Sequence, residues 1–296
     1  MSLAELGRVG AWGHLDSLDA ASARRYARRV EELGYGTLWV PETVGREPFT
    51  LLALLAGETS RLVLGTSIVG IWGHDAQTTR MASLTLSEAT GDRFVLGLGV
   101  SHPHLAEKLR GHRFERPLTR MREFLAAYRA AVIRAPALAD VAEPPVLVAA
   151  LRRRMTELAA TDADGAFPYL VTPEHVAGMR RTLDAAAVGP RRLLAVTLPV
   201  VLGAGPEAAA TARAYLKPYL RTPTYQAAWA LQGFEPADWE PPGSDRLLAA
   251  MVAVGDVARV REGIDALASA GADHVALIPL APDGATEHLA TLEALA

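Results

Sequence analysis

Short apolar runs alternate along the whole chain with segments whose apolar residues recur every three to four positions. The short runs are rich in Val, Ile and Leu and contain few charged residues. Continuous apolar runs of this length are typical of strands that are buried on both faces, as in parallel sheets. Eight runs are therefore expected to be strands: residues 8–12, 37–42, 62–71, 94–100, 146–151, 165–170, 193–202 and 274–280.

The intervening segments predict amphipathic helices, so the chain consists of β/α units. Eight such units in 296 residues favour a (β/α)₈ TIM barrel in a single domain spanning residues 1–296. A doubly wound sheet would need a GxGxxG turn after the first strand, and Gly10 and Gly13 do not form one. The predicted helix faces consist of Ala23, Tyr26, Ala27, Val30 and Leu33, of Leu118, Met121, Leu125, Tyr128 and Val132, and of Val257, Val260, Ile264 and Leu267.

Two insertions interrupt the regular spacing of the strands. The first follows the fourth strand (101–145), and the second follows the seventh strand (203–273) and is rich in aromatic residues and Pro over 221–244. Loops that follow barrel strands lie on the catalytic face. Both insertions are therefore expected to flank an active site there, and the second is a candidate lid.

Composition narrows the class of protein. Because there are no cysteines, thiolate catalysis and Cys-based metal sites are excluded. The net charge of −3 gives no basic surface of the kind that nucleic-acid binding requires. Residues 1–10 show no targeting signal, and no apolar run is long enough to span a membrane. We expect a cytoplasmic protein whose partner is a small molecule, with neither nucleic acid nor membrane involved.

Half of the eight histidines follow barrel strands: His14, His74, His102 and His104. Imidazole titrates near neutral pH, so these side chains are candidate acids or bases, although each could also be an ordinary loop residue bonded to backbone. His102-Pro103-His104 lacks the spacing of a helical metal-binding pair, and no metal site is predicted.

Glu42 ends the otherwise apolar second strand. Partial burial would raise the pKa of its carboxyl group and make it a usable acid. The alternative is a carboxylate that pairs with Arg46 or caps the next helix.

Two segments could bind an anion. Thr172-Pro173 is a helix start whose free N–H groups suit a phosphate, although ordinary capping explains the same residues. Arg152, Arg153 and Arg154 begin the helix after the fifth strand, where cations oppose the helix dipole. This placement suits an anionic ligand nearby, but three solvated arginines are equally compatible with it.

Several strings of this chain match one family in order: GYGTLWVPE, RLVLGTSIVGIW, TGDRFVLGLGVSH, DGAFPYLVTPEH and AGADHVALIPL. The chain resembles the luciferase-like monooxygenase superfamily, and specifically its coenzyme F420-dependent oxidoreductases. The resemblance implies a barrel, often a homodimer, that binds a deazaflavin or flavin at the carboxyl ends of its strands. The expected cofactor is F420, with FMN as the alternative and a separate reductase as its source of electrons.

The resemblance also implies cofactor contacts. The ring usually lies against a bulge in the third strand that contains a non-prolyl cis peptide, which falls here at Ser67-Ile68. The fourth strand passes near the cofactor, and the ends of the fifth and sixth strands hold its ribityl and phosphate parts. The implied cofactor-binding residues are Ser67, Ile68, Gly99, Val100, Ser101, Ala149, Ala150, Arg152, Tyr169 and Thr172.

The implied chemistry is hydride transfer to an imine, alkene or carbonyl, with a protein group supplying a proton. His102 and Glu42 are the candidate donors, and His14 is a third catalytic candidate. The substrate pocket is expected to be shaped by Trp12, Trp72, His74, Tyr225 and Trp229, the last two on the candidate lid.

Two departures from the family leave other functions open. Relatives commonly have Gly-Pro where this chain has Arg152-Arg153, and Arg-Asp-Pro where it has His74-Asp75-Ala76. Glycine permits close approach of a cofactor to the backbone, so the cofactor tail must bind differently here, or not at all. The alternatives are an FMN-dependent monooxygenase and a cofactor-free ligand-binding or non-redox barrel.

Overall fold

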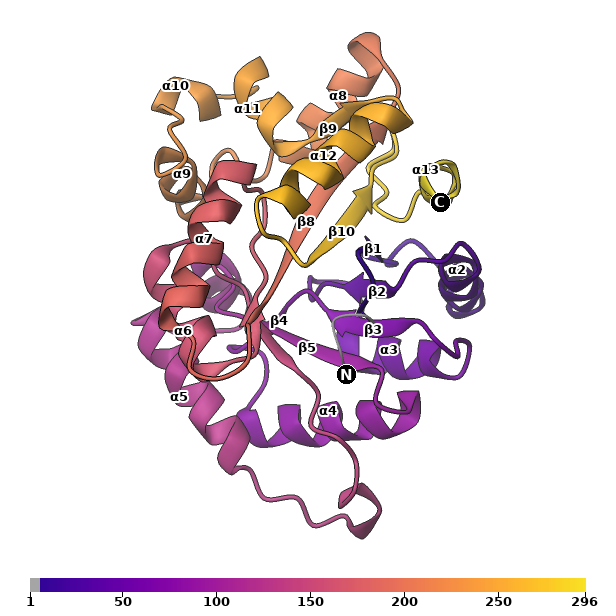
Figure 1. Cartoon of the computed structure of the whole chain (residues 1–296), viewed down its shortest axis with the longest axis vertical. Helices are drawn as coiled ribbons and strands as arrows, with labels where there is room; N and C mark the ends of the chain where they lie inside the picture. Colours follow the sequence, from indigo (N-terminus) through magenta and orange to yellow (C-terminus); the bar gives the residue numbers. More distant parts are fainter. Residues whose placement is uncertain (1–5) are drawn as a thin grey trace.

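A computed structural model describes residues 6–296, and its parallel strands close on themselves (Figure 1). The strands follow one another around the ring in chain order, and the last pairs with both the first and the one before it. The predicted TIM barrel is therefore confirmed. The strands of the barrel are β1 (Val9–Trp12), β2 (Thr37–Val40), β3 (Val63–Thr66), β5 (Phe94–Gly99), β6 (Val146–Val148), β7 (Gly165–Ala166), β8 (Leu193–Leu202) and β10 (His274–Pro279).

Helices cover the outside of the barrel and bury the predicted faces. Tyr26, Met121 and Ile264 are among the buried residues of three of these helices. The one misplaced residue is Val132, which lies beyond the end of its helix and is 62% exposed. The helices are α2 (Ala20–Glu32), α3 (Pro48–Ala56), α4 (Ala76–Thr90), α5 (Pro117–Ala130), α6 (Arg153–Asp162), α7 (Pro173–Ala186), α12 (Val257–Ser269) and α13 (Leu289–Leu295).

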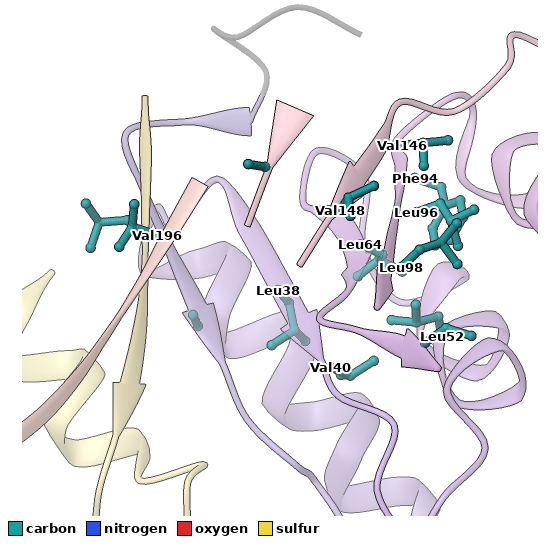
Figure 2. Close-up of a cluster of buried hydrophobic side chains, with 14 of the residues drawn as sticks. Leu38, Val40, Leu52, Leu64, Phe94, Leu96, Leu98, Val146, Val148 and Val196 are labelled. Atoms are coloured by element: carbon teal, nitrogen blue, oxygen red, sulfur yellow. The ribbon is translucent and has the colours of Figure 1, made fainter. Parts of the chain in front are cut away.

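Alternation along each strand divides the core into two layers. Leu38 and Val40 pack outward against helices in the cluster that Figure 2 shows, whereas Trp39 between them packs into the barrel interior. The Trp39 ring lies over Gly65 on the neighbouring strand, where a Cβ atom would come within 2.3 Å of a ring carbon. The barrel is thus a packed core at this level, and any cavity must lie beyond the strand ends.

The third strand is interrupted where a bulge was predicted. β3 ends at Thr66, β4 (Val69–Gly70) continues the pairing with β5, and the Ser67-Ile68 peptide bond between them is cis. The expected position and isomer are both confirmed.

The two insertions have structures of their own. After β5 come a π-helical turn (Leu105–Leu109), α5 and a 3₁₀ turn (Pro136–Leu138). After β8 come α8 (Gly205–Leu216), α9 (Pro223–Ala230), α10 (Pro236–Trp239) and α11 (Asp245–Met251), drawn in orange in Figure 1. These helices are followed by β9 (Ala253–Gly255), which pairs in parallel with the end of β8 and precedes α12.

No helix within residues 6–296 is both long and apolar enough to cross a membrane. The prediction that residues 1–10 carry no targeting signal falls partly on residues 1–5, which lie outside the described residues.

Candidate active site

A cavity of about 390 Å³ lies at the carboxyl ends of the barrel strands. Every barrel strand except β10 contributes a residue in it or just after it, and the second insertion adds Tyr219 and Tyr225. The geometry thus brings together most of the predicted site residues. Those that line the cavity are Trp12, His14, Glu42, Ser67, Ile68, Val100, Ser101, His102, Ala149, Ala150, Arg152, Tyr169 and Tyr225.

Five predicted site residues do not line this cavity. Trp72 donates from its indole to the Val100 carbonyl at 2.7 Å, and Trp229 is fully buried with its indole donating to the Leu170 carbonyl at 3.3 Å. His74 is bound to Glu42, and Gly99 packs behind the side chain of Ile68. Thr172 caps α7 by accepting from the His175 N–H and faces a second, surface pocket.

The Glu42 carboxylate is ionised and hydrogen-bonded, and the expectation of a raised pKa for this group is wrong. Its carboxylate accepts from the Gly70 N–H at 2.6 Å, from His74 Nε2 at 3.1 Å and from the Arg110 guanidinium. Burial alone would raise the pKa of Glu42, but the hydrogen bonds from His74 and Gly70 and the charges of His74 and Arg110 lower it below its ordinary value.

The alternative partner proposed for Glu42, Arg46, lies elsewhere. The Arg46 guanidinium donates to the Leu18 carbonyl, and its backbone N–H donates to the Asp16 carboxylate at 3.0 Å. Glu42 is instead tied through Arg110 to the first insertion. Its role in this structure is to join the second strand, the bulge and that insertion.

Two histidines of the cavity lining, His14 and His102, are held in their neutral form. Burial, with a smaller contribution from His104, lowers the pKa of His102 to about 4. Burial also lowers the pKa of His14, against the opposing charges of Asp16 and Glu287. The His102 ring stacks on His104 with centroids 5.9 Å apart and lies 5.4 Å from the ring of Tyr225. At neutral pH both His14 and His102 are therefore uncharged parts of an aromatic wall.

Three buried polar atoms of cavity-lining residues have no hydrogen-bond partner within residues 6–296. They are Trp12 Nε1, His102 Nδ1 and Thr197 Oγ1. Buried polar groups are almost always paired, since an unpaired one costs about 1–3 kcal/mol. Their gathering around one cavity indicates a site whose ligand carries donors and acceptors.

Sequence reasoning missed Thr197, Tyr215 and Tyr219. The hydroxyl group of Tyr169 contacts both the Tyr215 hydroxyl and, at 2.9 Å, the Tyr219 hydroxyl. Thr197 could have been found as the one hydroxyl residue in an otherwise apolar strand. The two tyrosines are four residues apart in YLKPYL, but nothing local in that string places them beside Tyr169.

The arginines after β6 divide between two environments. Arg152 lines the cavity, whereas Arg153 faces the surface pocket and pairs with Glu157 at 2.8 Å. No group of three or more His, Asp or Glu side chains able to hold a metal ion occurs within residues 6–296.

A closed parallel barrel with an aromatic cavity at the carboxyl ends of its strands is the layout of a barrel enzyme. Residues 1–274 match the family model described as luciferase-like monooxygenase, and the chain belongs to this family.

Two curated relatives are named for redox chemistry. A coenzyme F420-dependent oxidoreductase of Mycobacterium tuberculosis is 36% identical over 121 residues, which are 40% of this chain and 33% of the relative. A 5,10-methylenetetrahydromethanopterin reductase of Methanolobus tindarius is 25% identical over 182 residues, 56% of this chain and 55% of the relative. The chain thus matches between a third and just over half of the length of these proteins.

Solved structures share the fold over nearly the whole chain. The coenzyme F420-dependent tetrahydromethanopterin reductase of Methanopyrus kandleri superposes with a TM-score of 0.74 at 16% identity, covering 96% of each chain. The oxygenating constituent of 3,6-diketocamphane monooxygenase from Pseudomonas putida, solved with FMN, gives 0.72 at 16% identity, covering 97% of this chain and 96% of that one. At these identities the likeness extends to the fold alone.

Proposed function

We propose that this protein is an oxidoreductase that uses reduced coenzyme F420 as a hydride donor to an organic substrate. The observation that carries the proposal is the cavity itself, which has aromatic walls, a strand bulge at Ser67-Ile68 on one side and three unpaired polar atoms. The curated relative named for F420 supports this cofactor over FMN. A separate reductase would regenerate the reduced cofactor.

The charges of the cavity-lining side chains suit both the proposed cofactor and an uncharged organic substrate. Glu42 is neutralised by Arg110 and His74, and the pKa values of His14 and His102 are lowered, which leaves Arg152 as the unneutralised charge of the lining. An uncharged ring and substrate fit the neutral part. An anionic cofactor tail fits Arg152, which replaces close backbone approach by charge attraction.

When bound, the reduced deazaflavin supplies two electrons and a proton as hydride. The chain's residues would do the rest. Ser67, Ile68, Val100 and Ala149 would position the ring. Tyr219 and Tyr225 from the second insertion would cover the cavity and exclude water.

Fluorescence quenching of oxidised F420, and separately of FMN, tests the cofactor. We expect saturable quenching of F420 at lower concentration than FMN. Arg152→Ala should weaken F420 binding about tenfold, in proportion to one charge-assisted hydrogen bond. Arg154→Ala is the matched control, because Arg154 is an exposed neighbour outside the cavity lining. Preference for FMN would favour the monooxygenase alternative, and binding of neither would contradict the redox proposal.

A further inference from the structure

Three phenol groups meet where the second insertion packs on the end of β7. Tyr169 follows β7 and lines the cavity, Tyr215 lies on α8, and Tyr219 lies in the turn after α8. The Tyr169 hydroxyl is the shared partner of the other two. The ring centroids of Tyr169 and Tyr219 are 5.5 Å apart, and the Trp12 ring lies 6.3 Å from that of Tyr169.

The proposed hydride transfer needs a proton donor, and the two predicted donors are poorly suited to the task. Glu42 is already ionised and accepts from three donors. His102 is neutral at pH 7 because burial lowers its pKa to about 4, and a neutral imidazole is a very weak acid. A phenol is a stronger acid than a neutral imidazole, and the cluster contains three phenol groups, those of Tyr169, Tyr215 and Tyr219.

The number of hydrogens and lone pairs on each hydroxyl group indicates which of the three tyrosines can donate a proton to a ligand. A tyrosine hydroxyl has one proton to donate and two lone pairs to accept with. When Tyr215 and Tyr219 both donate to Tyr169, the Tyr169 proton stays free for a ligand in the cavity. The same two hydrogen bonds then stabilise the phenolate that forms when this proton leaves. Burial, and to a smaller extent the neighbouring Tyr215, Tyr219 and Tyr225, keeps the pKa of Tyr169 well above its ordinary value, so the proton is present at neutral pH.

We propose that Tyr169 donates the proton to the oxygen atom of a neutral carbonyl substrate, a ketone or an enone. Tyr215 and Tyr219 are positioning residues that stabilise its phenolate. The proposal rests on the proposed hydride transfer. It names carbonyls within the wider set of imines, alkenes and carbonyls because an iminium ion arrives already protonated and needs no such donor. The near-neutral cavity also suits an uncharged substrate.

The reaction balances for a ketone. A bound reduced deazaflavin would supply the hydride for the new C–H bond at the carbonyl carbon and, with it, the two electrons that reduce the substrate. The C=O π bond breaks, its electron pair moves to oxygen, and the Tyr169 proton binds there to give an alcohol. Tyr169 regains a proton from solvent through Tyr215 or Tyr219, which are both partly exposed.

The first test measures the donor without the cofactor and uses 4-nitrophenol, whose phenolate is coloured. A donor that stabilises an oxyanion should make bound 4-nitrophenol ionise at lower pH in the wild type than in Tyr169→Phe, by about one pH unit, as one charge-assisted hydrogen bond would give. Tyr26→Phe is the matched control, since its buried hydroxyl has no partner within residues 6–296 and lies on α2, away from the cavity. Equal ionisation in wild type and Tyr169→Phe would overturn the proposal.

The second test follows oxidation of reduced F420 by cyclohex-2-en-1-one. Tyr169→Phe should lower kcat at least a hundredfold, the usual value of a general acid. Tyr215→Phe and Tyr219→Phe should lower kcat about tenfold. In the 4-nitrophenol titration, each should raise the pH at which the bound dye ionises by less than Tyr169→Phe does, because Tyr169 is a weaker donor without a hydrogen bond to its own oxygen. A loss below threefold in Tyr169→Phe would overturn the proposal.

The two tests also separate this proposal from the one on which it rests. If the wild type neither binds F420 nor oxidises its reduced form, the proposed function fails. The 4-nitrophenol comparison still decides whether Tyr169 is an oxyanion donor.

Discussion

Two buried histidines of this barrel differ in what their ring nitrogens contact. His274, on β10, accepts at Nε2 from Trp39 Nε1 at 2.9 Å, so its proton lies on Nδ1 and is donated to the Gly7 carbonyl at 2.8 Å. His102, in the cavity wall, has an unpartnered Nδ1 within residues 6–296. Burial lowers the pKa of both to about 4.

The difference separates a structural histidine from one that awaits a ligand. Burial and a shifted pKa are common to both, so neither property identifies the functional one. Hydrogen-bond satisfaction does: His274 is complete without any ligand, whereas His102 is not. The same criterion points to Trp12 and Thr197 beside His102 in the cavity lining.

We expect the largest change in the free energy of unfolding from His274→Leu. The substitution leaves the Trp39 indole N–H and the Gly7 carbonyl buried without a partner, and each costs about 1–3 kcal/mol. We expect the free energy of unfolding to fall by about 3 kcal/mol, measured by urea denaturation at pH 7.5. A loss below about 1 kcal/mol would mean that the pairing of His274 contributes little.

The next prediction concerns how the free energy of unfolding depends on pH. The folded-state pKa of about 4 for both histidines lies below the ordinary 6.5, so the unfolded chain binds protons that the folded one does not. Stability must then fall as pH drops from about 6.5 toward 4, by up to about 1.4 kcal/mol per pH unit for each group. Urea denaturation between about pH 5 and 6.5, where few carboxylates titrate, measures this slope.

His102→Leu supplies the comparison for that slope. The variant should lose the share that His102 contributes and keep the share that His274 contributes. The two curves should therefore lie close together at neutral pH and separate as pH falls, with the wild type losing stability faster. Parallel curves would show that His102 is not held neutral by its surroundings.

The sequence predicts the fold well because local periodicity and barrel packing agree. Each run such as 94–100 must be apolar on both faces, one toward the interior and one toward helices, so its composition reveals the strand. The ends of those strands predict most of the cavity lining for the same reason. The bulge at Ser67-Ile68 was predicted from family resemblance, since nothing in the letters GTSIVGI requires it.

The failures have a common cause in contacts between distant segments. The pKa of Glu42 differs from the expected direction because the groups that lower it lie on distant segments: His74 and Gly70 are 32 and 28 residues away, and Arg110, with a smaller contribution, is 68 residues away on an insertion. Trp72 and Trp229 do not line the cavity as expected, and each indole donates to a backbone carbonyl, of Val100 and Leu170 respectively. Tyr215 and Tyr219 meet Tyr169 only through packing of the second insertion, which no local pattern encodes.

The smallest effect, and the sharpest test of the comparison, is the stability of His102→Leu at pH 7.5. No side-chain hydrogen bond of His102 to residues 6–296 is lost, and an apolar side chain of similar bulk replaces a neutral ring, so the free energy of unfolding should change by less than about 0.5 kcal/mol. His102→Leu should instead weaken the binding of oxidised F420, measured by fluorescence quenching. A destabilisation as large as that of His274→Leu would contradict the comparison, because it would mean that the His102 side chain already contributes to stability without a ligand. The two histidines would then be alike, and the cavity would have to be identified by its shape alone.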